Sequence, residues 1–313
     1  MGLQAAGLVL FMGVLFGSMS VISRYMLQQF EPMTFTAIRL AIAGLAFFIL
    51  YSFGLRGYRW PADKRLWRDS IFFGVIGDAV QLILYFSTLK YLSAGLTAIL
   101  WTFFPVLTVV LAHFFIKGER LTVRTSLGVG MGLAGALLIV LLGETGLDVS
   151  QGNSIRGYTL LLAAGLISVF FYLYARKNMV HYPTMDTVSI RVISAAVTSS
   201  LLAFFLEPNG VHGLTGLGVG LMLFAAVVFF FGFILTFYIL KQYGVTVASM
   251  VNYIPPIVAS LLGMIFLGER VTPGMVAGML LILAGVGVIN VVKGKTEPAE
   301  PSPQMADETE PDS

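Results

Sequence analysis

The sequence has no cysteine and few charged side chains, and both shortages narrow the classes of protein that it can encode. Without cysteine there is no disulfide framework and no thiolate to act as a nucleophile or a metal ligand. Charged residues make up 11% of the 313 positions, too few to cover the surface of soluble domains of this length. A soluble protein is therefore excluded.

Histidine is also scarce, and the patterns of several ligand-binding classes are missing. The three histidines, His113, His181 and His212, lie far apart in the sequence and lack the spacing of metal ligands. There is no nucleotide-binding glycine loop, and the Lys and Arg residues fall in short loops and form no continuous basic face. We therefore expect no metal, no cofactor, no ATP drive and no nucleic-acid partner.

Apolar residues, by contrast, make up 57% of the chain, and its mean hydropathy is +0.88. A helix needs ~20 apolar residues to cross the hydrocarbon of a bilayer. The first long apolar run follows no basic segment and continues through Arg24 toward a second run, so we interpret it as a retained helix rather than a signal peptide. In all, ten runs are long enough, at about residues 4–25, 32–53, 70–90, 93–116, 122–142, 157–178, 184–206, 217–240, 244–266 and 272–292.

The basic residues in the loops and at the ends of these runs are divided unevenly between the two faces of the membrane. With a cytoplasmic N-terminus, the inner face holds thirteen of these Lys and Arg residues and the outer face holds four. The outer four are Arg24, Lys90, Arg156 and Arg270. The positive-inside rule then predicts a multi-pass membrane protein with both termini in the cytoplasm.

Residues 94–135 resemble a second stretch of the same chain, 150 positions later. When the sequence is shifted by 150 positions without a gap, 11 of these 42 residues meet an identical one, including a proline and the whole motif Gly-Glu-Arg-x-Thr. Upstream, two arginines of each copy match at a shift of 152, Arg24 with Arg176 and Arg39 with Arg191. The chain is therefore a tandem duplication.

Each copy holds five predicted spans, and an odd number means that the second copy enters the membrane upside down. We therefore predict an all-α integral membrane protein with ten transmembrane helices, arranged as two inverted five-helix repeats. The first repeat covers residues 1–142 and the second 157–292, joined by an outer loop at 143–156. The acidic, proline-rich residues 293–313 have too little apolar surface to fold and are predicted to form a disordered cytoplasmic tail.

The arrangement of these features is similar to that of a known family. Ten spans in two inverted halves, a proline in the middle of the fourth and ninth, and Gly-Glu-Arg-x-Thr after each resemble the bacterial ten-helix branch of the drug/metabolite transporter superfamily, with two EamA-type domains. The resemblance covers about residues 8–292. It implies a location in a bacterial cytoplasmic (inner) membrane, and export of amino acids or other small metabolites through a central cavity lined by helices 1, 3, 4, 6, 8 and 9.

Pro105 and the pair formed by Pro255 and Pro256 lie in the middle of their spans. Proline removes a helical hydrogen bond and leaves the carbonyl four residues earlier without its usual donor. In lipid such carbonyls need a partner, so broken helices at matching places favour a gating element beside a cavity over a simple packing kink. The turns before the prolines supply the candidate substrate-binding residues Trp101, Thr102, Asn252 and Tyr253.

Asp78 is the only acid deep in a predicted span, where a charge costs about 2.5 to 3.5 kcal/mol on insertion scales. Gln81, Tyr85 and Thr88 follow it on one helical stripe, which favours contact with water or a ligand, and we add Gln81 and Tyr85 to the candidate site. Three alternative roles stay open for Asp78: carrying a coupling proton, binding a cationic group of the substrate, or forming an ion pair with Arg191, which lies at a similar depth.

Aromatic residues supply the last candidate positions. Phe230 and Phe233 lie on one stripe of the eighth span, and Ser168 and Tyr172 lie on one stripe of the sixth. A cavity walled by these residues and Trp101 favours an apolar or aromatic substrate, or an amphipathic cation if an acid lies beside them. The alternative is that they face lipid or anchor the interface, as most aromatic residues of such a chain do.

The repeated motif and the glycines have local explanations. We interpret Glu119 and Glu269 as residues of helix hairpins at the headgroups, each followed by a threonine (Thr122 or Thr272) that caps the next helix. Glycines spaced four residues apart occur in several spans and allow helices to approach closely. Packing within one chain explains them, so a monomer suffices, and a dimer stays open.

These observations predict a secondary transporter that moves a small amphipathic metabolite, an amino acid or a related amine or aromatic compound, by alternating access. The substrate, the coupling ion and the direction are not defined by the sequence. A channel or a lipid scramblase on the same fold is the alternative. We do not expect an intramembrane enzyme, because the chain offers no nucleophile with a base, no carboxylate pair and no metal cluster.

Overall fold

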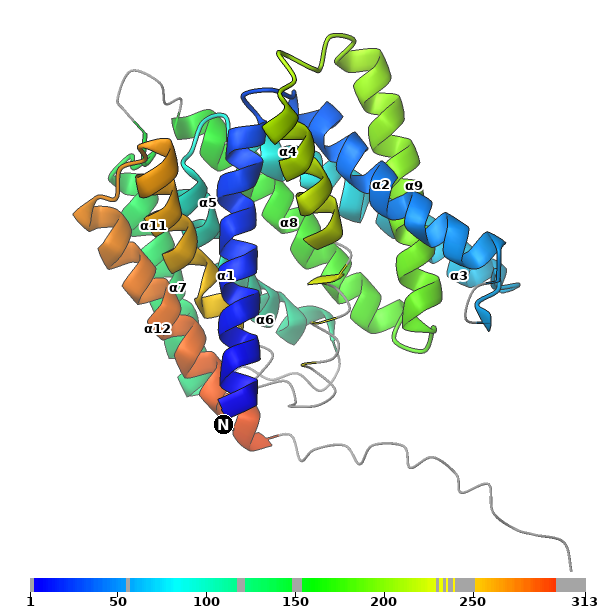
Figure 1. The fold of residues 1–313 in the computed structure, drawn as a ribbon. Coiled ribbons are helices and arrows are strands. Elements are labelled where there is room, and N and C mark those ends of the chain that lie inside the picture. Colours follow the sequence, from blue (N-terminus) through cyan, green and yellow to red (C-terminus); the bar gives the residue numbers. More distant parts are fainter. Residues whose placement is uncertain are drawn as a thin grey trace, which may run out of the picture.

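The computed structural model describes residues 3–54, 57–116, 122–147, 154–228 and 251–296, with isolated positions between 231 and 239. Regular structure in these ranges is helical, apart from one antiparallel bridge between Phe30 and Val211. The helices lie side by side in one bundle, and the N-terminus lies at the same end of the bundle as the end of the last helix (Figure 1). The start of the first helix and the end of the last helix therefore share one side, as the even number of predicted spans requires.

The helices of the first half are α1 (Leu3–Met26), α2 (Pro32–Ser52), α3 (Lys64–Phe72), η2 (Phe73–Val80), α4 (Gln81–Thr88), α5 (Ala94–Trp101), α6 (Phe104–Phe115) and α7 (Val123–Leu141). The second half contains α8 (Ser154–Asn178), α9 (Thr184–Leu206), a helix at Gly216–Val228, η3 (Val251–Tyr253), α11 (Pro255–Leu267) and α12 (Pro273–Thr296). Of these, η2 is a π-helix and η3 is a 3₁₀ turn.

These elements occupy the ten predicted spans. The elements α3, η2 and α4 continue one another as a single apolar run, Lys64–Thr88, and α5 and α6 form another, Ala94–Phe115. Seven helical runs in the described ranges are long and apolar enough to cross a membrane, and the shorter helices fall in the last three predicted spans. The prediction of an all-α membrane protein with ten helices is confirmed.

The predicted threonine caps are present at both copies of the repeated motif. Thr122 Oγ1 accepts a hydrogen bond from the backbone N–H of Thr125 at 3.2 Å, and Thr272 Oγ1 accepts one from Met275 at 3.1 Å. Such a bond satisfies one of the N–H groups that the first turn of a helix leaves without a partner. Each cap starts the last helix of its half immediately after the motif.

The most extensive contacts among the described helices join one half of the chain to the other. The fifth span, α7, packs along the tenth, α12, and the second span, α2, packs along the seventh, α9. Both are pairs of equivalent helices. Equivalent helices meet when a two-fold axis relates the two halves, as in an inverted repeat.

Glycines bring α7 and α12 into backbone contact. A Cβ atom placed on Gly128 would lie 2.6 Å from the carbonyl oxygen of Gly285, and one placed on Gly135 would lie 2.6 Å from that of Gly278. The repeat shift of 150 exchanges these two pairs, because it converts 128 into 278 and 135 into 285. The same contact is thus made twice with the partners exchanged, which is direct evidence for the inverted repeat.

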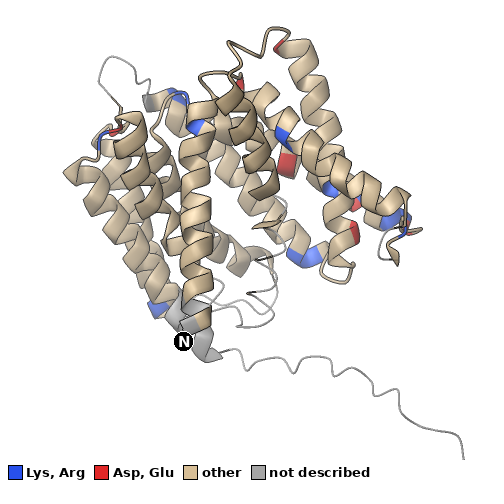
Figure 2. Ribbon diagram, in the orientation of Figure 1, with Lys and Arg blue, Asp and Glu red and all other residues tan. Residues whose placement is uncertain are grey.

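Loops that the topology assigns to the outer face meet at one end of the bundle. The backbone N–H of Ser93 donates to the carbonyl of Thr145 at 2.8 Å, and that of Arg270 donates to Gly146 at 2.9 Å. Charged residues gather near the helix ends, and few lie within the bundle (Figure 2). The relative placement of the loops therefore agrees with the predicted topology, while the side that faces the cytoplasm stays a prediction.

The absence of cysteine makes that orientation directly testable, because each introduced thiol is unique. Ala62 and Leu214 are exposed in loops that the topology places on opposite faces. We expect an impermeant maleimide added to intact cells to label Leu214→Cys and not Ala62→Cys, because the more basic loops stay inside. The reverse pattern would overturn the orientation, and equal labelling of both would indicate dual topology.

Candidate functional site

The fourth span is interrupted just before its proline. Helix α5 ends at Trp101 and α6 begins at Phe104, with Pro105 in its first turn. Between them, the N–H of Thr102 is shared by the carbonyls of Ala98, at 3.3 Å, and Ile99, at 3.2 Å. Pro105 has no N–H to offer the carbonyl of Trp101. The backbone at this break is therefore less completely paired than in a continuous helix.

The ninth span has the same interruption. The 3₁₀ turn η3 precedes α11, which has Pro255 in its first turn and the buried Pro256 beside it. Asn252, within the turn, is exposed, and Tyr253 is half-buried. Breaks at equivalent places in the two halves are the arrangement that transporters use around a site between repeats.

An aromatic cluster lies at the first break. The ring of Trp101 is centred 4.9 Å from that of Tyr85 on α4 and 5.2 Å from that of Phe104. Thr102 is buried, and its hydroxyl donates to the carbonyl of Ala98 at 2.9 Å, so it can only accept a hydrogen bond from a ligand. Trp101 and Tyr85, two of the candidate residues, are therefore in contact, whereas Thr102 offers only an acceptor to a substrate.

Each broken helix rests on a glycine from the other half. A side chain at Gly13 of α1 would overlap Ile254, and one at Gly165 of α8 would overlap the ring of Phe104. Phe104 and Ile254 are the residues immediately before Pro105 and Pro255, and the repeat shifts of 150 and 152 exchange the two contacts. The first helix of each half is thus packed directly against the break in the other half.

This packing predicts a marked cost for a single methyl group. Gly165→Ala should lower the free energy of unfolding by about 1–3 kcal/mol, because Phe104 is buried and has little space to move. Gly130→Ala is the matched control, since Gly130 has open space around it. Thermal unfolding in detergent measures both. Equal stability of the two variants would show that the contact at the break is loose.

Asp78 and Arg191 form an ion pair between the two halves. Arg191 Nε donates to Asp78 Oδ2 at 3.0 Å, and its Nη2 donates to Oδ1 at 2.8 Å. The side chains are 20% and 18% exposed, respectively. The guanidinium of Arg191 also lies 3.4 Å from the centre of the Phe73 ring. The pairing foreseen from the similar depth of the two residues is therefore present, in a geometry that uses both carboxylate oxygens.

Asp78 belongs to the π-helix Phe73–Val80. Such segments are rare within α-helices and occur frequently at functional sites. A side chain at Gly74 would overlap the backbone of Arg191, and a Cβ atom on Gly77 would lie 2.6 Å from the ring of Phe171. The π-helix is thus packed against both α9 and α8, and this close approach places Asp78 within reach of Arg191.

The other predicted site residues differ in exposure. Gln81 is buried, Ser168 is half-buried, and Tyr172 is 57% exposed. Phe230 and Phe233 lie outside the described residues. Their assignment to a substrate site stays a prediction. Within the described ranges, no group of side chains large enough to hold a metal ion occurs.

Glu269 lies in the hairpin between α11 and α12 as predicted, but its side chain is buried and does not lie free among the headgroups. Glu269 is 5% exposed and pairs with Nε of Arg24 through Oε1, at 2.9 Å. Its carboxylate also accepts the backbone N–H groups of Ala94, at 2.7 Å, and Gly95, at 3.2 Å, at the start of α5. Burial raises the pKa of Glu269, and these hydrogen bonds and the charge of Arg24 oppose the rise. Its counterpart Glu119 lies outside the described residues.

A second buried acid, Asp69, joins the halves at the opposite end of the bundle. It accepts hydrogen bonds from the hydroxyls of Tyr174, at 3.1 Å, and Tyr182, at 3.2 Å, and pairs with Arg68. Sequence reasoning missed it because Asp69 lies at the edge of an apolar run. The nearest signal in the sequence was a pair of tyrosines, Tyr174 at the end of the sixth span and Tyr182 just after it. Asp69 therefore connects α3 to α8 and the loop that follows it.

Comparison with known proteins identifies the family of this protein. A family model described as the EamA-like transporter family matches residues 3–141 and 155–291. The chain belongs to the EamA-like transporter family. It is therefore a membrane transporter and not an enzyme, and the predicted relation to bacterial drug/metabolite transporters is confirmed.

Relatives cover most of this EamA-like transporter. The uncharacterized transporter YvbV of Bacillus subtilis is 25% identical over 95% of this chain and 94% of its own length. A transporter named for S-adenosylmethionine and S-adenosylhomocysteine in Chlamydia muridarum is 23% identical over 91% of each chain. A crystal structure at 22% identity covers 95% of this chain and all of its own, with a TM-score of 0.62, and shows the same fold.

Proposed function

We propose that this EamA-like transporter exports a small amphipathic metabolite, an amino acid or a related amine or aromatic compound, by alternating access across the bacterial cytoplasmic membrane. The two halves, residues 1–142 and 157–292, would rock against each other around the broken helices. A single chain would suffice for this motion, and the acidic tail at 293–313 would have no part in it. The direction follows the resemblance to exporters.

The ion pair between Asp78 and Arg191 carries the proposal. It offers a carboxylate and a guanidinium at one place inside the membrane, each partly accessible. A zwitterion presents the complementary pair, so an amino acid would bind its carboxylate to Arg191 and its ammonium to Asp78 while the protein pair opens. The exchange would keep the two buried charges neutralised, which lowers the cost of opening the pair.

The aromatic cluster supports an amphipathic substrate. Trp101 and Tyr85 meet at the first break, and the second break carries Asn252 and Tyr253. Aromatic faces accept apolar groups and cations. In addition, the chlamydial relative is named for S-adenosylmethionine and S-adenosylhomocysteine, both of which carry a free amino group and a carboxylate. Asp78 would also be the place for a coupling proton, if one is used.

Flux through vesicles that contain the purified protein tests the proposal. Trp101→Ala and Asn252→Ala should each reduce amino-acid flux at least tenfold, about 1.4 kcal/mol, while insertion and purification stay normal. Phe205→Ala, an exposed aromatic residue at the end of α9, is the control and should transport normally. Wild-type flux in both variants would place the substrate elsewhere.

The same vesicles separate the alternative classes. A carrier shows saturable flux that substrate on the opposite side accelerates, because the loaded carrier returns faster than the empty one. Electrical conductance would instead indicate a channel. Exchange of labelled phospholipid between the leaflets without substrate flux would indicate a lipid scramblase on the same fold.

A further inference from the structure

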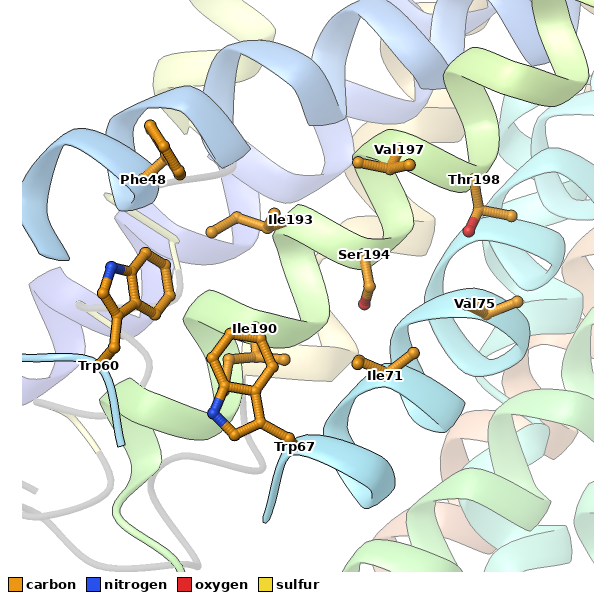
Figure 3. A pocket seen from close by; sticks show the side chains of 10 residues that line it. All are labelled: Phe48, Trp60, Trp67, Ile71, Val75, Ile190, Ile193, Ser194, Val197 and Thr198. Carbon is orange, nitrogen blue, oxygen red and sulfur yellow. The ribbon is translucent and has the colours of Figure 1, made fainter. Parts of the chain in front are cut away.

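A second site is suggested by an apolar groove of about 630 Å³ between α2, α3 and α9. Its walls include Phe48 on α2 and Ile193 and Val197 on α9, and one of its ends is formed by Trp60 and Trp67 (Figure 3). The volume is in the range of pockets that hold small ligands, about 300–1,000 Å³. No residue of the proposed substrate site lines the groove.

The two tryptophans mark the depth of the groove mouth. Their rings are centred 5.7 Å apart, and the ring of Trp60 is centred 4.9 Å from that of Tyr51. The indole N–H of Trp67 donates to the carbonyl of Pro61 at 2.9 Å, which fixes its ring. Clustered tryptophan and tyrosine residues sit at the headgroup level of a bilayer. The mouth therefore lies among the headgroups, and the groove runs from there along α9 into the hydrocarbon.

Three basic residues lie close in the sequence to the tryptophans of this mouth. Arg59 directly precedes Trp60, and Lys64 and Arg65 begin the helix that carries Trp67. All three are exposed, and none of them forms an ion pair with another described residue. The carboxylate of Asp63 accepts a hydrogen bond from the backbone N–H of Arg65 at 2.8 Å and so caps the helix. Asp186 also lies near the mouth, because its carboxylate accepts a hydrogen bond from the hydroxyl of Tyr51, whose ring packs against Trp60. The three basic residues outnumber Asp63 and Asp186, so the mouth keeps a net positive charge at the depth where lipid phosphates lie.

We propose that the groove holds an acyl chain of an anionic phospholipid whose phosphate contacts Arg59, Lys64 and Arg65. An empty groove in a bilayer would lose dispersion contacts along its walls, so a lipid tail fills it. Lipid tails are equally apolar in all phospholipids and give no selectivity. The three basic side chains supply it, because basic clusters beside a membrane span attract anionic headgroups.

The bound lipid would bridge the two halves of the transporter. The groove walls come from α2 and η2 of the first half and from α9 of the second. Ser194 lines the groove and is in close contact with the backbone at Gly74, on the same face of α9 that brings Arg191 to Asp78. A lipid held there would stabilise the arrangement in which α9 and the π-helix are packed together.

Tryptophan fluorescence can test the site, because the chain has only three tryptophans. Trp101→Phe leaves the two at the groove mouth as the sole emitters. The full-length variant is placed in phosphatidylcholine vesicles that contain a rising fraction of phosphatidylglycerol or phosphatidylcholine brominated on the acyl chain. Bromine quenches tryptophan on contact. We expect phosphatidylglycerol to reach half-maximal quenching at about a fivefold lower fraction, which corresponds to ~1 kcal/mol.

Two further variants separate the headgroup contact from the groove. The combined substitution Arg59→Gln, Lys64→Gln and Arg65→Gln should remove the preference but keep quenching by either lipid. Val197→Phe fills the groove and should weaken quenching by both, whereas Leu201→Phe, one turn further along α9, should not. A charge-matched control, Arg124→Gln with Arg176→Gln and Lys177→Gln, should keep the preference. Equal quenching by both lipids before any of these changes, or quenching by neither, would overturn the proposal.

Discussion

Asp78→Asn is expected to lower the free energy of unfolding by about 3 kcal/mol, because it leaves the guanidinium of Arg191 without its counter-charge inside the membrane. Transport should fall below detection in the same variant. Thermal unfolding in detergent and substrate flux into vesicles measure the two effects. Asp63→Asn is the control, since Asp63 is exposed and asparagine keeps an oxygen that can cap the helix, so its stability should change little.

The flux measurement also separates the roles of Asp78. If the carboxylate binds the substrate, both substrate exchange and gradient-driven accumulation should be lost in Asp78→Asn, and we expect this result. If it carries only a coupling proton, exchange should survive without a gradient. If the pair is purely structural, charge reversal by Asp78→Arg with Arg191→Asp should restore both folding and transport. Normal flux with normal stability in Asp78→Asn would contradict every one of these roles.

Glu269→Ala is expected to destabilise the protein by about 3–5 kcal/mol. It leaves the guanidinium of Arg24 without its counter-charge, and two backbone N–H groups of α5 without their acceptor. A carboxylate at the start of a helix is also favourable for the helix dipole, and that contribution disappears as well. The melting temperature of the purified protein reports the loss. We expect it to exceed the loss in any single variant of an exposed ion pair.

Glu31→Gln provides the matched comparison at the same end of the bundle. Glu31 pairs with Lys90 and His212, and its side chain is 33% exposed. Exposed pairs contribute about 0–1 kcal/mol, so Glu31→Gln should change the melting temperature little. A similar loss in Glu31→Gln and Glu269→Ala would mean that the burial of Glu269 adds nothing to stability, and that its contacts with Arg24 and with the start of α5 are dispensable.

The ten helices could be predicted from the sequence because the requirements of a bilayer are simple. A span needs a length and a hydropathy, and both are visible in the chain. The breaks at Pro105 and Pro255 were also visible, since the missing N–H of proline is a property of the residue and not of its surroundings. The similar depth of Asp78 and Arg191 made their ion pair one of three roles that the sequence left open for Asp78.

Contacts between distant loops could not be predicted in this way. Glu269 lies in a polar motif that looks like any helix hairpin, and only the folded bundle shows that α5 begins beside it. The π-helix around Asp78 was hidden for a related reason. Its sequence has α-helical hydropathy, and it depends on the close approach that Gly74 and Gly77 allow toward α9 and α8. Local patterns carry no information about such neighbours.

The dominance of contacts between the halves has a consequence for biosynthesis. Helices α2 and α7 find their main partners, α9 and α12, only in the part of the chain that is translated last. During synthesis the first five spans would therefore remain in the bilayer with few helix contacts until the second half is inserted. Single transmembrane helices can be inserted before they associate. Two fragments divided in the loop at 143–156 should be unstable when each is made alone, and should assemble into a working transporter when both are made in the same cell.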